Sequence, residues 1–224
     1  MVSLKLLLCF SVPLFFLSAC DTTPYKEQKK NKEAGEEIAQ AYLTMAHEKV
    51  SIQNYQGAIE DFDKAIENDS TFSPAYTDRG GIHIALKNYE AAINDFNTAV
   101  RLSPVKQQCL IDRARLKALM EDNKGAIKDY EAAQKLEPIK SPIYYEKAWL
   151  EFLERNYKDS YADLSEAIKQ SPSFGKAYEA RGYVNVALGK IEEACADFEK
   201  ARVNGVKLGD DPVIQNCTAG KQSS

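Results

Sequence analysis

Five aspartates and four basic residues recur at intervals of 34 residues, and their side chains define the clearest chemistry in this sequence. The aspartates are Asp61, Asp95, Asp129, Asp163 and Asp197, and the basic residues are Arg79, Arg113, Lys147 and Arg181. Carboxylates and guanidinium or ammonium groups with a shared period are suited to charge-assisted hydrogen bonds. No nucleophile elbow, phosphate-binding glycine loop, HExxH or CxxC motif accompanies them. We therefore expect a structural role for these charges, without catalysis and without a metal or other cofactor.

Each aspartate could bind the basic residue of the following repeat or that of its own repeat. The first repeat has no predecessor, and it carries Met45 where the others carry the basic residue. This favours pairing between repeats, as Asp61–Arg79, Asp95–Arg113, Asp129–Lys147 and Asp163–Arg181, with Asp197 left over. Pairing within a repeat would leave Asp61 over instead. Two solvated charged stripes without pairing are the third interpretation.

The same period runs through small and large apolar positions. Alanine recurs at Ala65, Ala99, Ala133, Ala167 and Ala201, and a large side chain at Phe62, Phe96, Tyr130, Leu164 and Phe198. Small residues let helix backbones approach closely, and apolar residues at a 3.6-residue period form one helix face. The period divides the chain without insertion into five repeats, 39–72, 73–106, 107–140, 141–174 and 175–208. It indicates an array of helix pairs.

These repeats resemble the tetratricopeptide repeat (TPR) family, whose unit has the same length. The resemblance covers most of the chain after residue 38 and implies an all-α fold. That fold is a right-handed α-solenoid of five 34-residue pairs of antiparallel helices, A and then B. Pro104, Pro138 and Pro172 are expected to end B helices, because proline cannot continue a helix. The sequence departs from the family pattern, since the fourth position is never Trp and the eleventh is never Tyr.

The first 19 residues read as a signal peptide. Lys5 precedes an apolar run at residues 6–17, which is interrupted by Pro13 and is too short to span a bilayer comfortably. A transmembrane anchor is the alternative.

The sequence Leu17-Ser18-Ala19-Cys20 resembles the bacterial lipobox. That resemblance implies cleavage before Cys20 and its modification with acyl chains such as palmitate, which anchor a protein in a membrane. Residues 20–38 are the lipidated cysteine and a charged tether, helical towards its end. We expect the protein to be located on the exported side of the bacterial cell envelope. Asp21 resembles an inner-membrane retention signal, but inner and outer membrane both stay open.

Residues 209–224 are expected to form a C-terminal cap and tail. Gly205 would end the last B helix, and Asp211 and Pro212 would begin a short capping helix. Cys195 and Cys217 either form a disulfide that pins this cap or stay two buried thiols. Cys109 is expected to be a small core residue.

In TPR proteins the A helices line a concave groove that binds peptides or partner helices. Carried over by position, the groove residues of this chain are His47, Arg115, Tyr145, Trp149, Phe152, Lys176, Glu179 and Tyr183. Four of them are aromatic and belong to repeats four and five, where exposed rings can anchor a partner. The alternative is that some rings pack between neighbouring A helices. The two histidines, His47 and His83, are expected on helix surfaces.

The function expected is that of a non-catalytic scaffold or adaptor, a TPR lipoprotein that binds another protein in its groove. It would touch the membrane through its lipid alone. The formal net charge of −4 argues against a nucleic-acid partner. Two alternatives are a component of an outer-membrane protein or envelope assembly machinery, and a regulatory subunit of an envelope enzyme complex. The sequence does not indicate the oligomeric state.

Overall fold

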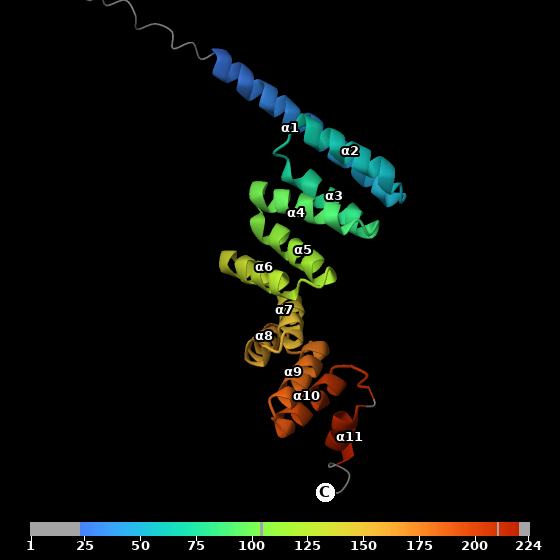
Figure 1. The fold of residues 1–224 in the computed structure, drawn as a ribbon, viewed down its shortest axis with the longest axis vertical. Helices are drawn as coiled ribbons and strands as arrows, with labels where there is room; N and C mark the ends of the chain where they lie inside the picture. Colours follow the sequence, from blue (N-terminus) through green and yellow to red (C-terminus); the bar gives the residue numbers. More distant parts are fainter. Residues whose placement is uncertain (1–22, 104, 210, 220–224) are drawn as a thin grey trace, which may run out of the picture.

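The structure is a computed structural model that describes residues 23–103, 105–209 and 211–219. These residues form eleven α-helices and no β-strand. The helices follow one another along the long axis of the molecule, from α1 at the N-terminal end to α11 at the other (Figure 1). The expected signal peptide, the lipobox with Cys20 and the helix-ending Pro104 lie outside the described residues.

Ten helices form five pairs, and the eleventh follows the last pair. The A helices are α1 (Thr23–Ser51), α3 (Ser73–Ala85), α5 (Lys106–Leu119), α7 (Ser141–Leu153) and α9 (Gly175–Ala187). The B helices are α2 (Tyr55–Asn68), α4 (Tyr89–Leu102), α6 (Asn123–Leu136), α8 (Tyr157–Gln170) and α10 (Ile191–Val203), and α11 (Pro212–Ala219) is the cap. Each A helix packs on its own B helix, and each B helix contacts the next A helix. The expected α-solenoid of helix pairs with a capping helix is therefore confirmed.

The periodic residues form the core between the helices. The five periodic alanines have no exposed surface, and Phe62, Tyr130, Leu164 and Phe198 are each 1% exposed. Burial of one such side chain contributes roughly 1.5–3 kcal/mol. Because the same positions pack in every repeat, the core runs through the whole array.

The turn between helices A and B repeats one backbone feature. Gln53, Lys87, Glu121, Arg155 and Gly189 are 34 residues apart and have positive φ angles of 59°, 62°, 64°, 62° and 75°. Four of these residues are not glycine, although a left-handed conformation is unfavourable for residues with a Cβ atom. The surrounding helix ends therefore impose this turn in each repeat.

Two glycines on A helices should respond in opposite ways to replacement by alanine. A Cβ atom at Gly182 would lie 2.6 Å from the Phe198 ring, whereas one at Gly81 would meet nothing within 4 Å. We expect Gly182→Ala to lower the free energy of unfolding by about 1–2 kcal/mol through overpacking. Gly81→Ala should raise it by about 0.5–1 kcal/mol through helix propensity. Urea unfolding of both variants checks this, and destabilisation of similar size in both would contradict it.

Helix α1 corrects the expected tether. It begins at Thr23 and continues without interruption into repeat one, so residues 23–38 are helical throughout. Exposed pairs Lys29–Glu33 and Lys32–Glu36 at 3.7 Å add small stabilising terms along this segment. A Cβ atom at Gly35 would lie 2.7 Å from the carbonyl oxygen of Asn68, so α1 lies close against the end of α2 there.

The cap forms as expected from its sequence. Asp211 Oδ1 accepts a hydrogen bond of 2.8 Å from the backbone N–H of Val213, and Pro212 is the first residue of α11. Ile214 is 4% exposed and packs with Ala194 and Phe198 of α10. A disulfide joins Cys195 to Cys217 with a Cα–Cα distance of 5.1 Å, which selects one of the two alternatives left by the sequence.

Candidate partner-binding groove and the ion pairs beside it

The A helices border a groove made of three hollows. The N-terminal hollow has a volume of about 1040 Å³ and lies over α1, α3 and the start of α5. The central hollow, about 410 Å³, lies over Gly81, and the aromatic hollow, about 340 Å³, lies beside Trp149. Asp78 borders the first two hollows, and Arg115 borders the last two. The hollows therefore follow one another along α1, α3, α5 and α7, and together they are called the groove.

Four of the groove residues expected from the sequence line this groove. His47 borders the central hollow, and Tyr145 and Trp149 border the aromatic hollow. Arg115 borders both of these hollows. Trp149 is 42% exposed. Phe152 borders none of the three hollows but stacks on Trp149 with ring centroids 5.7 Å apart, which positions the exposed indole ring. The rings of repeat four are thus brought together.

The expected residues of repeat five do not border the three hollows, and Tyr183 packs inward, as the alternative for the aromatic rings allowed. Tyr183 packs edge-on against Phe198 at 5.2 Å and belongs to the core cluster under the capping helix. Lys176 and Glu179, on α9, border none of the three hollows. For Tyr183 the physical reason is the cap, because Ile214 of α11 belongs to the cluster against which Tyr183 packs.

Contacts between basic and acidic side chains link two pairs of successive A helices along the groove. His47 Nε2 lies 2.7 Å from Asp78 Oδ2, which links α1 to α3. Arg115 donates to both carboxylate oxygens of Glu146 at 2.9 and 3.1 Å, which links α5 to α7, and these bonds raise the pKa of Arg115. The Tyr130 hydroxyl donates to Glu146 at 2.8 Å. The groove wall is therefore preorganised by charge-assisted bonds.

The N-terminal hollow was not expected from the sequence. Its lining includes the carboxylates of Glu33, Glu36, Glu37, Asp69 and Asp78. No Lys, Arg or His side chain stands among the described residues that line it. The three glutamates fall in the segment interpreted as a tether, where no apolar repeat marks a packed helix. The opposite charges spaced four residues apart, Lys29–Glu33 and Lys32–Glu36, were the available signal of a helix.

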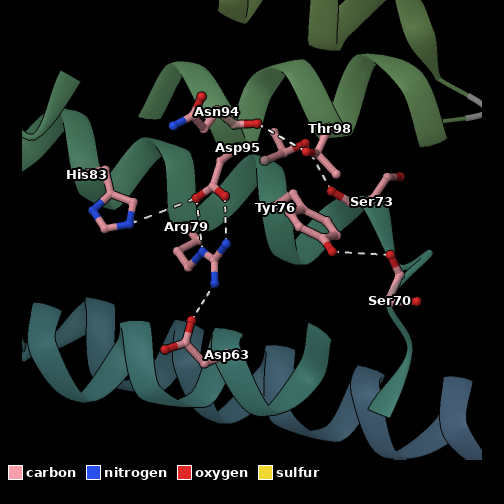
Figure 2. A network of polar contacts seen from close by, with 10 residues as sticks. Asp63, Ser70, Ser73, Tyr76, Arg79, His83, Asn94, Asp95 and Thr98 are labelled. Atoms are coloured by element: carbon pink, nitrogen blue, oxygen red, sulfur yellow. Dashed lines mark hydrogen bonds and ion pairs between the residues drawn. The ribbon is translucent and has the colours of Figure 1, made fainter. Parts of the chain in front are cut away.

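A buried ion pair joins helices A and B within each of repeats two to five. Arg79 donates to both oxygens of Asp95 at 2.6 and 2.9 Å, as Figure 2 shows, and also binds Asp63 of the preceding repeat. Arg113–Asp129 and Arg181–Asp197 repeat this bidentate geometry at 2.7–2.9 Å, and Lys147 binds Asp163 at 2.6 Å. The described aspartates of these pairs are 5–9% exposed.

The register of pairing expected from the sequence is wrong. Each basic residue binds the aspartate that follows it by 16 residues, not the one that precedes it by 18. Helices A and B are antiparallel, so the two positions face each other inside one repeat. Asp61 is the aspartate left over, and it binds Lys49 at 2.5 Å and Lys64 at 3.4 Å instead. Contact with the preceding repeat uses other partners, Asn97 for Arg113 and Ser165 for Arg181.

His83 also differs from its expected surface position. Its side chain is 16% exposed, and its Nε2 atom lies 3.9 Å from Asp95 Oδ2 (Figure 2). The residues at the corresponding place in repeats one and three, Lys49 and Lys117, bind the aspartate of their own repeat. This place therefore supplies a second positive or polar group to the aspartate in most repeats.

Repeat four is the exception, because Glu151 occupies this place. Glu151 is 2% exposed, and Lys147 binds both Glu151 at 3.0 Å and Asp163 at 2.6 Å. Burial raises the pKa of Glu151 to about 7, and the negative charge of Asp163 contributes to this shift. Burial also raises the pKa of Asp163. Two buried carboxylates thus share one ammonium group.

We expect Glu151→Gln to stabilise the protein at alkaline pH. A folded-state pKa of about 7 against an ordinary value of 4.5 means that the folded state holds a proton that the unfolded state has released. Stability should therefore fall as pH rises through this window, by an amount on the order of 1–3 kcal/mol. Urea unfolding at pH 5 and pH 8 should show the variant above the wild type only at pH 8. Glu60→Gln, on an exposed position, is the control, and parallel curves for wild type and Glu151→Gln would contradict the account.

Among residues 23–219, with the gaps named above, no helix is both long enough and apolar enough to cross a membrane. In the same part of the chain, no group of three or more His, Cys, Asp and Glu side chains is placed to hold a metal ion.

The fold defines a repeat protein of helix pairs, and comparison with known proteins gives its family. Models of the tetratricopeptide repeat match residues 43–106 and 175–201. Together with the fold, they define this chain as a TPR protein. No curated protein matches the sequence significantly.

Several solved structures share this fold. A crystal structure of MamA aligns with a TM-score of 0.70 and 18% identity, covering 77% of this chain and 98% of that one. YrrB, described as a TPR protein with an unusual peptide-binding site, aligns with a TM-score of 0.69 and 19% identity, covering 90% and 100%. PilW, described as a type IV pilus biogenesis factor, aligns with a TM-score of 0.63 and 15% identity, covering 84% and 93%. At these identities the likeness concerns the fold.

Proposed function

We propose that this protein is a non-catalytic scaffold that binds a peptide or helix of another protein in the groove along its A helices. The row of three adjacent hollows carries this proposal, because it offers an extended chain both an exposed indole ring and a row of fixed polar and charged side chains. Aromatic anchors in a preorganised setting are typical of protein-binding surfaces. The description of YrrB as peptide-binding supports the same use of a similar fold.

The proposal is tested by capture of partners from solubilised membranes of the source organism. The bait is the wild-type chain beside a Tyr145→Ala/Trp149→Ala variant and a control with Glu60→Gln on the B-helix surface. The expected result is one protein captured by wild type and control and lost with the aromatic variant. Equal capture by all three baits would remove the groove assignment, and no specific capture would overturn the scaffold function.

We propose further that the protein is anchored in the bacterial cell envelope by acyl chains on Cys20. The lipobox-like sequence before Cys20 supports this, and several acyl chains are sufficient for lasting attachment. Fractionation of cells that express wild type or Cys20→Ala is the test. The wild type should stay with the membrane after a high-salt wash, and the variant should not; retention of both would contradict the lipid anchor.

A further inference from the structure

Contacts between a basic side chain of one A helix and a carboxylate of the next occur at two of the four steps between the A helices that the structure describes. These contacts are His47–Asp78 and Arg115–Glu146, and in both the two residues are 31 positions apart in the sequence. Between α3 and α5, the residues at the corresponding positions are Gly81 and Asp112, and between α7 and α9 they are Trp149 and Ala180. Glycine supplies no cation, so Asp112 receives none from the preceding helix.

The place of the missing side chain is open. A Cβ atom built on Gly81 meets no atom within 4 Å, and Gly81 lies in the lining of the central hollow together with Asp78 and Asp112. The remaining lining includes the apolar side chains of Val50, Ile82 and Ile84. It also includes His47 and Arg115, whose closest carboxylate contacts are with Asp78 and Glu146. Such a site suits a lysine or arginine, whose aliphatic stem packs on apolar surface while its charged end meets carboxylates.

Among the described residues, the carboxylate of Asp112 has only two polar contacts within its own helix, α5. It accepts a hydrogen bond of 2.9 Å from Gln108, and Arg115 lies 3.6 Å away while making its shorter bonds to Glu146. The Asp112 side chain is 24% exposed. Burial raises the pKa of its carboxyl, and the negative charges of Asp78 and Glu146 raise it further. A cation placed over Gly81 would lower the free energy of all three carboxylates.

The negative charge continues along the groove towards the N-terminus. Asp78 and Thr77 border both the central hollow and the N-terminal hollow of about 1040 Å³. Four more carboxylates line that hollow, Glu33, Glu36, Glu37 and Asp69. Exposed lysines pair with Glu33 and Glu36 at 3.7 Å, which leaves the hollow negative overall. Opposite charge along an extended groove favours one class of partner and excludes acidic ones.

We propose that the partner enters this groove as a peptide segment rich in lysine or arginine, with one basic side chain seated over Gly81 between Asp78 and Asp112. This inference rests on the proposed scaffold function and names the chemistry of its partner. The next basic residues of the segment lie against the carboxylates of the N-terminal hollow, and its apolar residues continue towards Trp149.

The variant Gly81→Arg tests the proposed position of the basic side chain directly, because it places a cation of the chain itself over residue 81. The open space over Gly81 accommodates the side chain, and the new guanidinium should bind Asp112 as Arg115 binds Glu146. Gly81→Ala is the matched control for the backbone change. Asp112→Asn removes one of the two carboxylates beside Gly81. Glu192→Gln, at an exposed position of α10, makes the same charge change outside the groove.

The probe is a fluorescein-labelled 12-residue peptide of alternating Arg and Ala, compared with the same peptide carrying Gln for Arg, titrated with the full chain in mild detergent. We expect fluorescence anisotropy to show at least tenfold tighter binding of the arginine peptide. Gly81→Arg should weaken it at least tenfold, far more than Gly81→Ala, and Asp112→Asn should weaken it several-fold, whereas Glu192→Gln should change it less than twofold. Equal effects of Gly81→Arg and Glu192→Gln would overturn the proposal.

Panning a library of random 16-residue peptides on the same chain separates this inference from the function beneath it. Enrichment of basic peptides that Gly81→Arg no longer binds supports the proposal. Peptides without basic residues that are lost with Trp149→Ala would overturn it and leave the scaffold function standing. A library without any groove-dependent binder would overturn both. Dimerisation of the chain that Gly81→Arg abolishes would assign the groove to a second copy and also overturn the proposal.

Discussion

Replacement of Asp129 by alanine is expected to lower the free energy of unfolding by about 3–5 kcal/mol, because it removes one side of a buried ion pair. Asp129 is 5% exposed and accepts bonds from Arg113 at 2.7 and 2.8 Å, and Lys117 lies 2.8 Å away. Without the carboxylate, both cations stay between α5 and α6 without compensation. Urea unfolding at neutral pH measures the loss.

The effect should depend on pH in a defined direction. The bonds with Arg113 and Lys117 hold the pKa of Asp129 below its ordinary value, despite the opposing effect of burial. A depressed pKa contributes stability above the unfolded-state value, near pH 4, and this contribution is lost as pH falls through the folded-state pKa. Wild type and Asp129→Ala should therefore differ fully at neutral pH and converge in strong acid.

Two controls separate the ion pair from general damage to repeat three. Glu131→Ala removes an exposed carboxylate from the same helix, and it should change stability by less than about 0.5 kcal/mol. The triple variant Asp129→Leu/Arg113→Met/Lys117→Met removes all three charges. It should recover most of the loss, since apolar replacement of a buried ion cluster is often neutral. A loss from Asp129→Ala no larger than that from Glu131→Ala would contradict the account.

Loss of the disulfide is expected to cost about 3 kcal/mol, because the bond between Cys195 and Cys217 closes a loop with a sequence separation of 22. The cap otherwise depends chiefly on Ile214, which packs on Phe198. A reducing agent should lower the midpoint of thermal unfolding by roughly 6–12 °C for a chain of this size. It should also release α11 first, which exposes α10 to hydrogen exchange.

The variant Cys195→Ser/Cys217→Ser is the control for the reducing agent. Its thermal midpoint should match that of the reduced wild type and should not respond to reductant. Thiol titration of unfolded, unreduced protein gives an independent check, because a bonded pair does not react. Reactivity of both cysteines in that titration would contradict the disulfide.

The 34-residue period was sufficient to predict the helix pairs, because the packing of alanines against rings repeats in every unit. It was not sufficient to choose the register of the ion pairs. A basic residue and its two neighbouring aspartates share one period, so the same pattern fits pairing within or between repeats. Met45 favoured the wrong choice, because the cation for Asp61 comes from Lys49, on the next turn of α1.

The groove was predicted in part, and the errors have a common cause. Position within a repeat placed Trp149 and Tyr183 alike, but the cap covers Tyr183 and leaves Trp149 exposed. The N-terminal hollow depends on α1 continuing ahead of repeat one, where Glu33 and Glu37 follow no apolar period. Both errors concern the ends of the array, where α1 extends ahead of repeat one and α11 follows repeat five. The 34-residue period does not predict the structure of segments that lie outside the repeats.

Site-specific photocrosslinking in living cells tests the central claim, that the A-helix groove binds another protein. A photoreactive phenylalanine analogue is placed at Gln108 or Trp149 in the groove, and at Glu60 or Lys128 on exposed B-helix surfaces. The account predicts adducts with a partner protein from the two groove positions and none from the two B-helix positions. Adducts from the B-helix positions alone, or from none of the four, would contradict it.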